Sequence, residues 1–157
     1  MLPGPPFIII GPMSVSGKTR ILALDMGEKR IGVALSDAEA RLASPLMVLP
    51  KRGRDENVRA IAALVVEHQV GLIVLGLPRK SETELGPGAQ AIQGFGKRLA
   101  KALKIPVDFV DEFETTVRAQ EALLEADVSR AKRRAKVDKV AAALILEAYL
   151  AGPEEGA

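Results

Sequence analysis

The order in which short apolar runs and longer amphipathic segments follow one another is the feature that most limits the fold. Three apolar runs come first, over residues 20–25, 30–36 and 43–49, and only short polar breaks separate them. Connections this short join antiparallel strands. Two further runs, 72–75 and 107–110, alternate with helical patterns, and such units form right-handed parallel crossovers. The sequence predicts a mixed five-stranded α/β sheet flanked by helices, three antiparallel strands followed by two parallel additions.

Helical periodicity predicts the remaining elements. A first helix capped by Asp55 ends near Gly71, and its apolar positions are Val58, Ile61, Ala62, Val65 and Val66. A second helix carries Ala89, Ile92, Phe95, Leu99 and Leu103 at helical spacing. We expect Gly76-Leu77-Pro78 to close the fourth strand and Asp111-Glu112 to close the fifth. A third helix begins at Thr115 or Thr116 and runs to about residue 126, and a last helix covers 136–150.

The length and composition limit the class of protein. A chain of 157 residues suits one domain, which we expect over residues 13–151. Prolines break residues 1–12, which we interpret as an appended or disordered extension, and residues 152–157 should be a frayed tail. The absence of cysteine excludes disulfide and thiolate chemistry and favours a cytoplasmic location. No apolar run approaches the roughly 18 residues that span a bilayer.

Carboxylates fall where strands end, which is where ligands bind in open α/β sheets. Asp25 ends the first strand, and Asp111 and Glu112 follow the fifth. Asp138 shares the apolar face of the last helix with Ala141, Ala142, Ile145 and Tyr149 by its spacing. A lone aspartate on such a face would be costly to desolvate unless it were paired or bound a cation. The alternative is an ordinary first-turn aspartate, stabilised by the helix dipole or by Lys136 or Arg134.

Clustered carboxylates suit hard cations with oxygen ligands, above all Mg²⁺ or Mn²⁺. Such a centre, built from Asp25, Glu112 and Asp138 with Asp111 as a further candidate, can activate water and stabilise charge on a phosphodiester. No histidine- or cysteine-rich ligand set competes, since His68 is the only histidine. The sequence therefore predicts a metal-dependent nuclease.

Basic residues crowd into one segment near the last helix, at Arg130, Lys132, Arg133, Arg134 and Lys136. A patch of this density favours a polyanion such as nucleic acid, although a solvated basic loop is the alternative. We add Lys29, Arg30 and Arg79, which lie close in sequence to the strand ends, to the candidate contacts. The net charge of +2 does not itself indicate a partner.

The residues around these strand ends have candidate supporting roles. Gly27 could do no more than supply turn geometry or close packing, and Gly76 could let backbone approach a phosphate or simply help to end a strand. Pro78 could do no more than end a strand, and Thr115 and Thr116 are most simply helix caps.

Four ordered segments show that the chain resembles the YqgF/RuvX family, whose members are described as Holliday junction resolvases or as nucleases that mature the 5′ end of pre-16S ribosomal RNA. The segments are 24–37 (LDMGEKRIGVALSD), 74–78 (VLGLP), 110–116 (VDEFETT), and 136–142 with 145–150 (KVDKVAA and ILEAYL). The resemblance covers about residues 20–150. It implies an RNase H-like fold and acidic catalysts at Asp25, at Glu112 with Asp111 beside it, and at Asp138.

One position departs from the family pattern, because Phe113 stands where the family usually has arginine. A cation that could neutralise phosphate is therefore missing there, and Arg79 or Arg118 could replace it. Pre-16S rRNA processing is the leading interpretation. Resolution of four-way DNA, which needs two symmetric cuts and hence a homodimer, is the first alternative, and a non-catalytic nucleic-acid-binding module is the second.

Two phosphate-binding alternatives fail on the sequence. The segment Ser16-Gly17-Lys18-Thr19 resembles a P-loop, but the motif needs a glycine at position 12, which is proline. An Asp-x-Gly turn after a first strand also occurs in actin-like ATPases and sugar kinases, whose two lobes need a longer chain.

Overall fold

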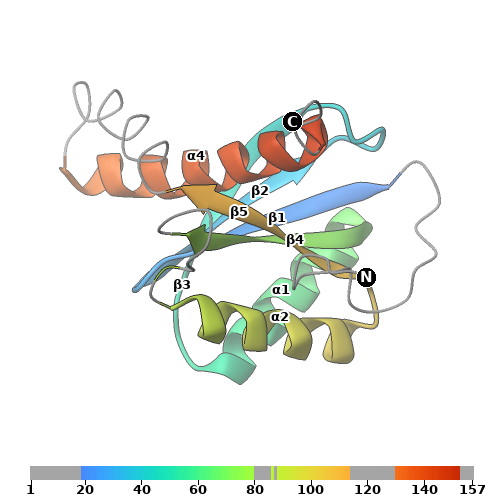
Figure 1. Cartoon of the computed structure of the whole chain (residues 1–157), viewed down its shortest axis with the longest axis horizontal. Coiled ribbons are helices and arrows are strands. Elements are labelled where there is room, and N and C mark those ends of the chain that lie inside the picture. Colours follow the sequence, from blue (N-terminus) through green and yellow to red (C-terminus); the bar gives the residue numbers. More distant parts are fainter. Residues whose placement is uncertain (1–18, 80–85, 87, 114–129, 153–157) are drawn as a thin grey trace.

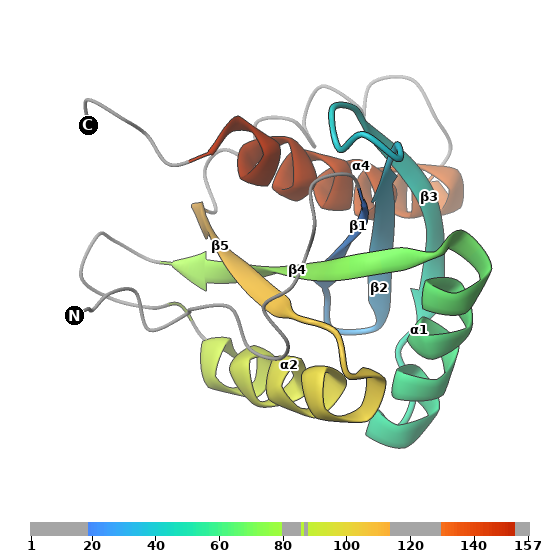
Figure 2. The ribbon, with the colours of Figure 1, turned by 90° about the vertical axis from the view of Figure 1, so that its right-hand side faces the viewer.

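The computed structural model describes residues 19–79, 86, 88–113 and 130–152 of the chain. They form a sheet with one long helix on one face and two helices on the other (Figures 1 and 2). The elements are β1 (Arg20–Met26), β2 (Arg30–Ser36), β3 (Ala43–Pro50), α1 (Arg54–His68), β4 (Val70–Arg79), α2 (Ala89–Leu103), β5 (Val107–Phe113) and α4 (Arg130–Ala151).

The sheet has the order β3-β2-β1-β4-β5, with β1 at its centre. β1 pairs antiparallel with β2, and β2 pairs antiparallel with β3. β4 and β5 are added parallel on the other side of β1. The predicted fold class, a mixed sheet with three antiparallel strands and two parallel additions, is confirmed.

Alternating strand residues divide the core in two, as the period of two requires. Leu22 and Leu24 of β1 point to the side of α1 and α2, where they join Leu75, Phe95 and other apolar residues. Ile21 and Ala23 point to the side of α4, where Ala142, Ile145 and Leu146 cover them. In β1, the even-numbered residues therefore lie on the side of α1 and α2, and the odd-numbered residues lie on the side of α4.

β4 and β5 are longer than the sequence predicts. Gly76-Leu77-Pro78 and Asp111-Glu112 do not close these strands but continue them, because Leu77 pairs with Asp111 and Pro78 with Glu112. The paired positions of β1 reach only to Leu75 on β4. Pro78 therefore has a strand on one side alone, where the missing backbone N–H does no harm.

The helix ends also differ from the prediction in two places. α1 begins at Arg54 after Gly53, with no side-chain cap, so Asp55 lies in the first turn and forms an ion pair with Arg98 instead. α4 begins at Arg130, so the basic segment is helical rather than a loop before the helix. α2 spans the residues expected. The extension 1–12, the third helix over 115–126 and most of the tail 152–157 lie outside the described residues.

Among the described residues, no helix is both long and apolar enough to cross a membrane.

Candidate active site

Asp25 is the penultimate residue of β1, the central strand. It pairs with Gly32 of β2, and the alternation that sends Ile21 and Ala23 towards α4 places Asp25 on that same face. The residue is half-buried. A carboxylate here lies at the carboxyl edge of the parallel strands and next to the helix that carries Asp138.

Glu112 lies on β5, two strands from Asp25, and Gly76 of β4 occupies the strand between them. A Cβ placed on Gly76 would come within 3.0 Å of Glu112 Oε2. The carboxylate of Glu112 therefore leans over β4 towards β1, across a position that has no side chain. The glycine allows a carboxylate from an outer strand to approach the one on the central strand.

Gly76 also sets how closely α4 approaches the sheet. The same Cβ would overlap Ile145 Cδ1 and would lie 3.0 Å from Ile145 Cγ1. Gly76 and Ile145 are both buried. Close contact between the helix and the backbone of β4 thus brings α4 beside the carboxylate of Glu112.

Asp138 belongs to α4, but its side chain lies outside what the structure describes. Its backbone position is four residues before Ala142 and seven before Ile145, both of which are buried against the sheet. Helical periodicity puts these three positions on one face of α4.

Asp111 differs from the other acidic candidates. It is exposed and lies on β5 one residue before Glu112, so strand alternation places it on the opposite face, towards which Phe109 points. The structure does not bring Asp111 towards Asp25. Within the described residues, no three acidic, histidine or cysteine side chains are placed to hold a metal ion together. Asp25 and Glu112 supply two carboxylates, and Asp138 is the candidate for a third.

The turn after Asp25 is tightly built. Gly27 N–H donates to Arg30 O at 2.9 Å, and a Cβ on Gly27 would lie 2.8 Å from that oxygen, so glycine is required for the turn. Lys51 N–H donates to Lys29 O at 2.9 Å and Lys51 Nζ donates to Gly27 O at 3.0 Å. Sequence reasoning missed Lys51, because only the tertiary fold brings the residues after β3 to this turn.

A hydrogen bond fixes the far end of α4 to the sheet. Tyr149 Oη donates to Asp108 Oδ2 at 3.0 Å, and Asp108 Oδ1 accepts the N–H of Phe109 at 2.8 Å. Burial, followed by the charge of Asp108 and the hydrogen bond to it, raises the pKa of the Tyr149 phenol well above its ordinary range. Tyr149, which the helical spacing places on the apolar face of the last helix, thus binds the sheet through its hydroxyl.

The basic and supporting candidates that the structure describes belong to the β1–β2 turn, to β4 and to the first turns of α4. Lys29 is exposed and Arg30 half-buried at the β1–β2 turn, and Pro78 is half-buried near the end of β4. Arg79 ends β4, and Arg130, Lys132, Arg133, Arg134 and Lys136 belong to the first turns of α4; the side chains of these six lie outside what the structure describes. Thr115 and Thr116 fall wholly outside the described residues.

The chain is similar in sequence to proteins of a known family. The model of the family RuvX, described as Holliday junction resolvase, matches residues 19–152. A protein of Pelotomaculum thermopropionicum named "Putative pre-16S rRNA nuclease" is 47% identical over 132 residues, which are 83% of this chain and 86% of the relative. A protein of Syntrophomonas wolfei with the same name is 45% identical over 137 residues, which are 87% of this chain and 97% of the relative.

Among solved structures, the fowlpox virus Holliday junction resolvase is similar with a TM-score of 0.51 and 14% identity, over 85% of this chain and 99% of that one. At this identity the likeness concerns the fold alone. It confirms the RNase H-like architecture that the sequence resemblance implied.

Proposed function

Because this chain belongs to the RuvX family of Holliday junction resolvases, we propose that it is a metal-dependent nuclease that hydrolyses phosphodiester bonds in structured nucleic acid. The observation that carries the proposal is the position of the Glu112 carboxylate, which leans over Gly76 towards the strand of Asp25 on the face covered by α4. Two carboxylates from separate strands are thereby directed to one edge of the sheet.

The donor chemistry fits Mg²⁺ or Mn²⁺, since the candidate ligands are all carboxylate oxygens. Asp25 and Asp138 would hold the metal, and Glu112 would either hold it or position the attacking water. When bound, the metal supplies an activated water and neutralises charge on the phosphate. In the reaction, the oxygen of water bonds to phosphorus and one ester P–O bond breaks, so that the leaving oxygen takes up a proton.

The basic residues of the first turns of α4 would hold the phosphate backbone. These turns precede Asp138 in the same helix, so phosphate contacts made there would place the strand beside the carboxylates. Lys29 and Arg30, at the turn that follows Asp25, and Arg79 would contribute from the sheet side. Binding through such contacts weakens as salt rises.

For the substrate, we propose the 5′ end of pre-16S rRNA, on the strength of the name that relatives at 45–47% identity carry. Four-way DNA is the second candidate, favoured by the description of the family model. Junction resolution would further require two active sites related by a two-fold axis, and hence a homodimer.

The test is cleavage of a labelled pre-16S-like RNA and a labelled four-way DNA junction, with Mg²⁺, with Mn²⁺ and with neither. Asp25→Asn, Glu112→Gln and Asp138→Asn should each abolish cleavage, because each removes a charge without changing shape, while binding persists. Asp111→Asn is the matched control and should cut at a rate within a few-fold of the wild type, since its carboxylate faces away from the site.

Equal losses for Asp111→Asn and Glu112→Gln would contradict this assignment of faces. Cleavage that does not need added metal, or that survives Asp25→Asn, would refute the metal centre. Cleavage of only one substrate would choose between RNA processing and junction resolution. No cleavage of either substrate, with binding intact, would favour a non-catalytic binding module.

The basic segment is tested separately through salt. Replacing Arg133 and Arg134 together by Ala should weaken binding and reduce the slope of log affinity against log salt by about 1–2. An unchanged slope would show that these side chains do not contact phosphate.

A further inference from the structure

A cavity of about 600 Å³ opens at the same edge of the sheet but on the side of α1 and α2. Residues from the β1 and β4 ends, from α2 and from the β3–α1 connection line it, notably Met26, Pro78, Ile92, Phe95, Lys51 and Arg54. Met26 directly follows Asp25 in β1. The cavity therefore begins one residue from the candidate catalytic strand position, on the opposite face.

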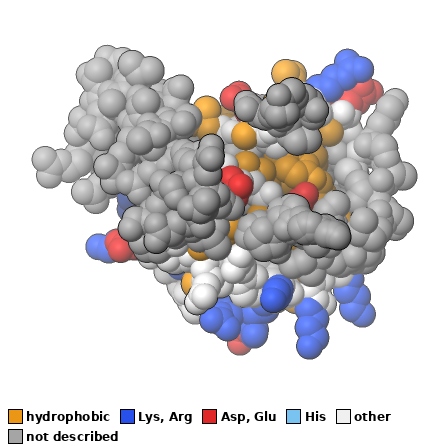
Figure 3. Space-filling model, viewed as in Figure 1, with side chains coloured by type: hydrophobic (Ala, Val, Ile, Leu, Met, Phe, Trp, Pro, Cys, Tyr) orange, Lys and Arg blue, Asp and Glu red, His pale blue; other side chains and the backbone are white. Residues whose placement is uncertain are grey.

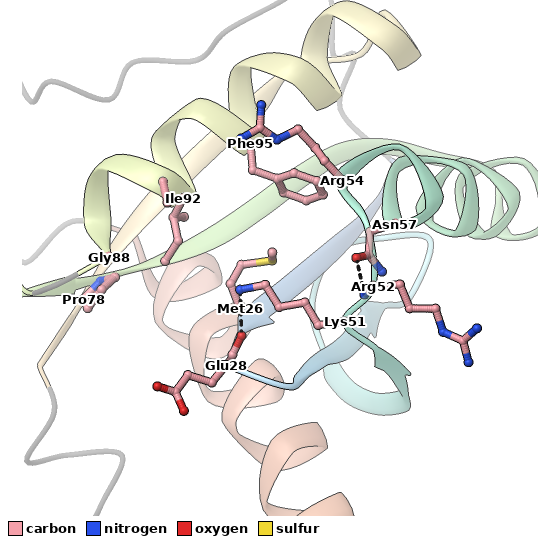
Figure 4. A pocket seen from close by; sticks show the side chains of 12 residues that line it. Met26, Glu28, Lys51, Arg52, Arg54, Asn57, Pro78, Gly88, Ile92 and Phe95 are labelled. Carbon is pink, nitrogen blue, oxygen red and sulfur yellow. Dashed lines mark hydrogen bonds between the residues drawn. The ribbon is translucent and has the colours of Figure 1, made fainter.

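The floor of the cavity is apolar. Met26 and Ile92 are half-buried and Phe95 is buried, and all three belong to or pack against the same core cluster. In Figure 4 the side chains of Met26, Ile92 and Phe95 face the open space from β1 and α2. Phe95 is buried and shapes this floor from below, and an apolar floor of this kind can take the apolar surface of a nucleic-acid base.

The opposite wall is basic and is held in place. Arg54 is exposed and extends from the start of α1 towards Phe95 (Figure 4). Lys51 is tied through its Nζ to Gly27 O. The buried Asn57 accepts the N–H of Arg52 at 2.8 Å and donates to Pro50 O at 3.0 Å. It therefore fixes the β3–α1 connection, which carries Lys51 and leads directly into Arg54, the first residue of α1. Glu28, the acidic residue that lines the cavity, points away from its centre in Figure 4.

Charge elsewhere on this side suits an anion too. The first turn of α2 meets the cavity at Gly88 and Ala91, and backbone N–H groups at a helix start attract phosphate. Figure 3 shows Lys and Arg side chains along the edge formed by α1 and α2. The exposed cations of these two helices are Arg54, Arg59, Lys97, Arg98 and Lys101; Arg98 is paired with Asp55, and α1 also exposes Glu56 and Glu67.

We infer that this cavity receives one unpaired nucleotide of the strand that the enzyme cuts, with the base on Met26, Ile92 and Phe95 and the phosphate towards Arg54 and Lys51. A volume of about 600 Å³ lies in the range of small-molecule sites and cannot admit a duplex. That the strand is the substrate rests on the proposed nuclease function; that the cavity takes an unpaired nucleotide rests on its own shape and charge.

The experiment measures binding apart from cleavage. The full chain with Asp25→Asn is titrated with a single-stranded oligonucleotide that carries 2-aminopurine, and with its fully paired duplex. Arg54→Gln and Phe95→Leu, each added to Asp25→Asn, should weaken single-strand binding about 5-fold or more, suppress the 2-aminopurine fluorescence change, and leave duplex binding unchanged. Arg41→Gln, an exposed arginine in the β2–β3 connection, is the matched control and should have no effect.

Because Phe95 is buried, a thermal melt of Phe95→Leu accompanies the titration to show whether this variant folds. Arg54 lies on the surface, so Arg54→Gln tests the cavity even where Phe95→Leu does not fold. Unchanged single-strand binding and unchanged fluorescence in Arg54→Gln would overturn the inference. Tight binding of a free nucleoside monophosphate, with oligonucleotide binding indifferent to both variants, would also overturn it.

The two proposals can fail independently. Suppose that the wild type cuts neither substrate, while single-strand binding depends on Arg54 and Phe95. The cavity assignment then stands and the proposed nuclease function does not. If the wild type cuts both substrates and Arg54→Gln binds and cuts equally well, the nuclease stands and the cavity assignment does not.

Discussion

Replacing Gly76 by Ala should cost both stability and activity, through two separate contacts. Gly76 is buried, and a Cβ there would overlap Ile145 Cδ1 and lie 3.0 Å from Glu112 Oε2. Ile145 is itself only 3% exposed, so its end cannot move freely into solvent. Overpacking of a dense core by one carbon typically costs about 1–3 kcal/mol, equivalent to a fall in Tm of about 3–10 °C for a domain of this size.

The measurement is urea unfolding, with the midpoint and slope read from the same transition. Gly94→Ala is the matched control, because a Cβ at Gly94 of α2 would meet nothing within 4 Å. In an exposed helix interior that change should stabilise the chain by about 0.5–1 kcal/mol. If Gly76→Ala lowers the free energy of unfolding and Gly94→Ala raises it, the loss at Gly76 comes from packing and not from the general effect of replacing a glycine.

A second variant separates the two contacts of Gly76. Ile145→Val removes Cδ1, so Gly76→Ala with Ile145→Val should be more stable than the sum of the single changes predicts, by about 0.5–3 kcal/mol. The close contact between the new Cβ and the Glu112 carboxylate remains in the double variant. Its cleavage rate should therefore stay about 10- to 100-fold below that of the wild type. Additive stabilities, or a Gly76→Ala protein as stable as the wild type, would refute this account of how α4 meets β4.

Three further predictions concern single residues. Tyr149 is the only tyrosine and the chain has no tryptophan, so an alkaline absorbance titration should show the phenol ionising above its ordinary pKa in the native protein and near about 10 in urea. The stability that this raised pKa contributes is complete below pH 10 and is lost as pH rises further; a native titration near 10 would disprove it. Asn57→Ala should lower the free energy of unfolding in urea by about 1–3 kcal/mol, because the part-buried hydrogen bonds of Asn57 with Arg52 N–H and Pro50 O are both lost. The N–H groups of Leu42 and Arg41 hold the pKa of the Asp37 carboxyl below its ordinary range, which contributes stability above pH 4 that is lost on acidification; the Tm gap between wild type and Asp37→Asn should therefore narrow towards pH 2.

The order of the elements could be predicted because it depends on local periodicity. The alternation of apolar residues in strands and their spacing in helices do not depend on what the chain packs against. The short connections between β1, β2 and β3 favour antiparallel pairing. The ends of β4 and β5 could not be predicted in the same way. Polar and proline residues such as Pro78 and Asp111 are ordinarily strand breakers, yet each is kept extended by its partner on the neighbouring strand, and that partner is far away in the sequence.

The candidate site was predictable in position but not in detail. Strand polarity alone brings Asp25 and Glu112 to one edge. The lean of Glu112 over Gly76 depends on contact between α4 and β4, which no local pattern encodes. The cavity was even harder to predict from the sequence. Its floor and its basic wall come from residues 26–28, 51–57 and 88–95, and each of these segments by itself resembles an ordinary turn or helix start. Asp55 shows the same limit, since an apparent cap is used in an ion pair with Arg98.

The two faces of β1 link the proposed chemistry to the proposed cavity. Asp25 and Met26 are neighbours in a strand, so one points to the face of α4 and the other to the face of α1 and α2. A nucleic-acid strand in contact with both must pass over the carboxyl edge of the sheet rather than lie along one face. A base that is paired within a continuous duplex cannot enter the cavity. The base pairs beside the cutting site must therefore open locally. The favoured substrate should therefore be the one whose cutting site offers an unpaired nucleotide.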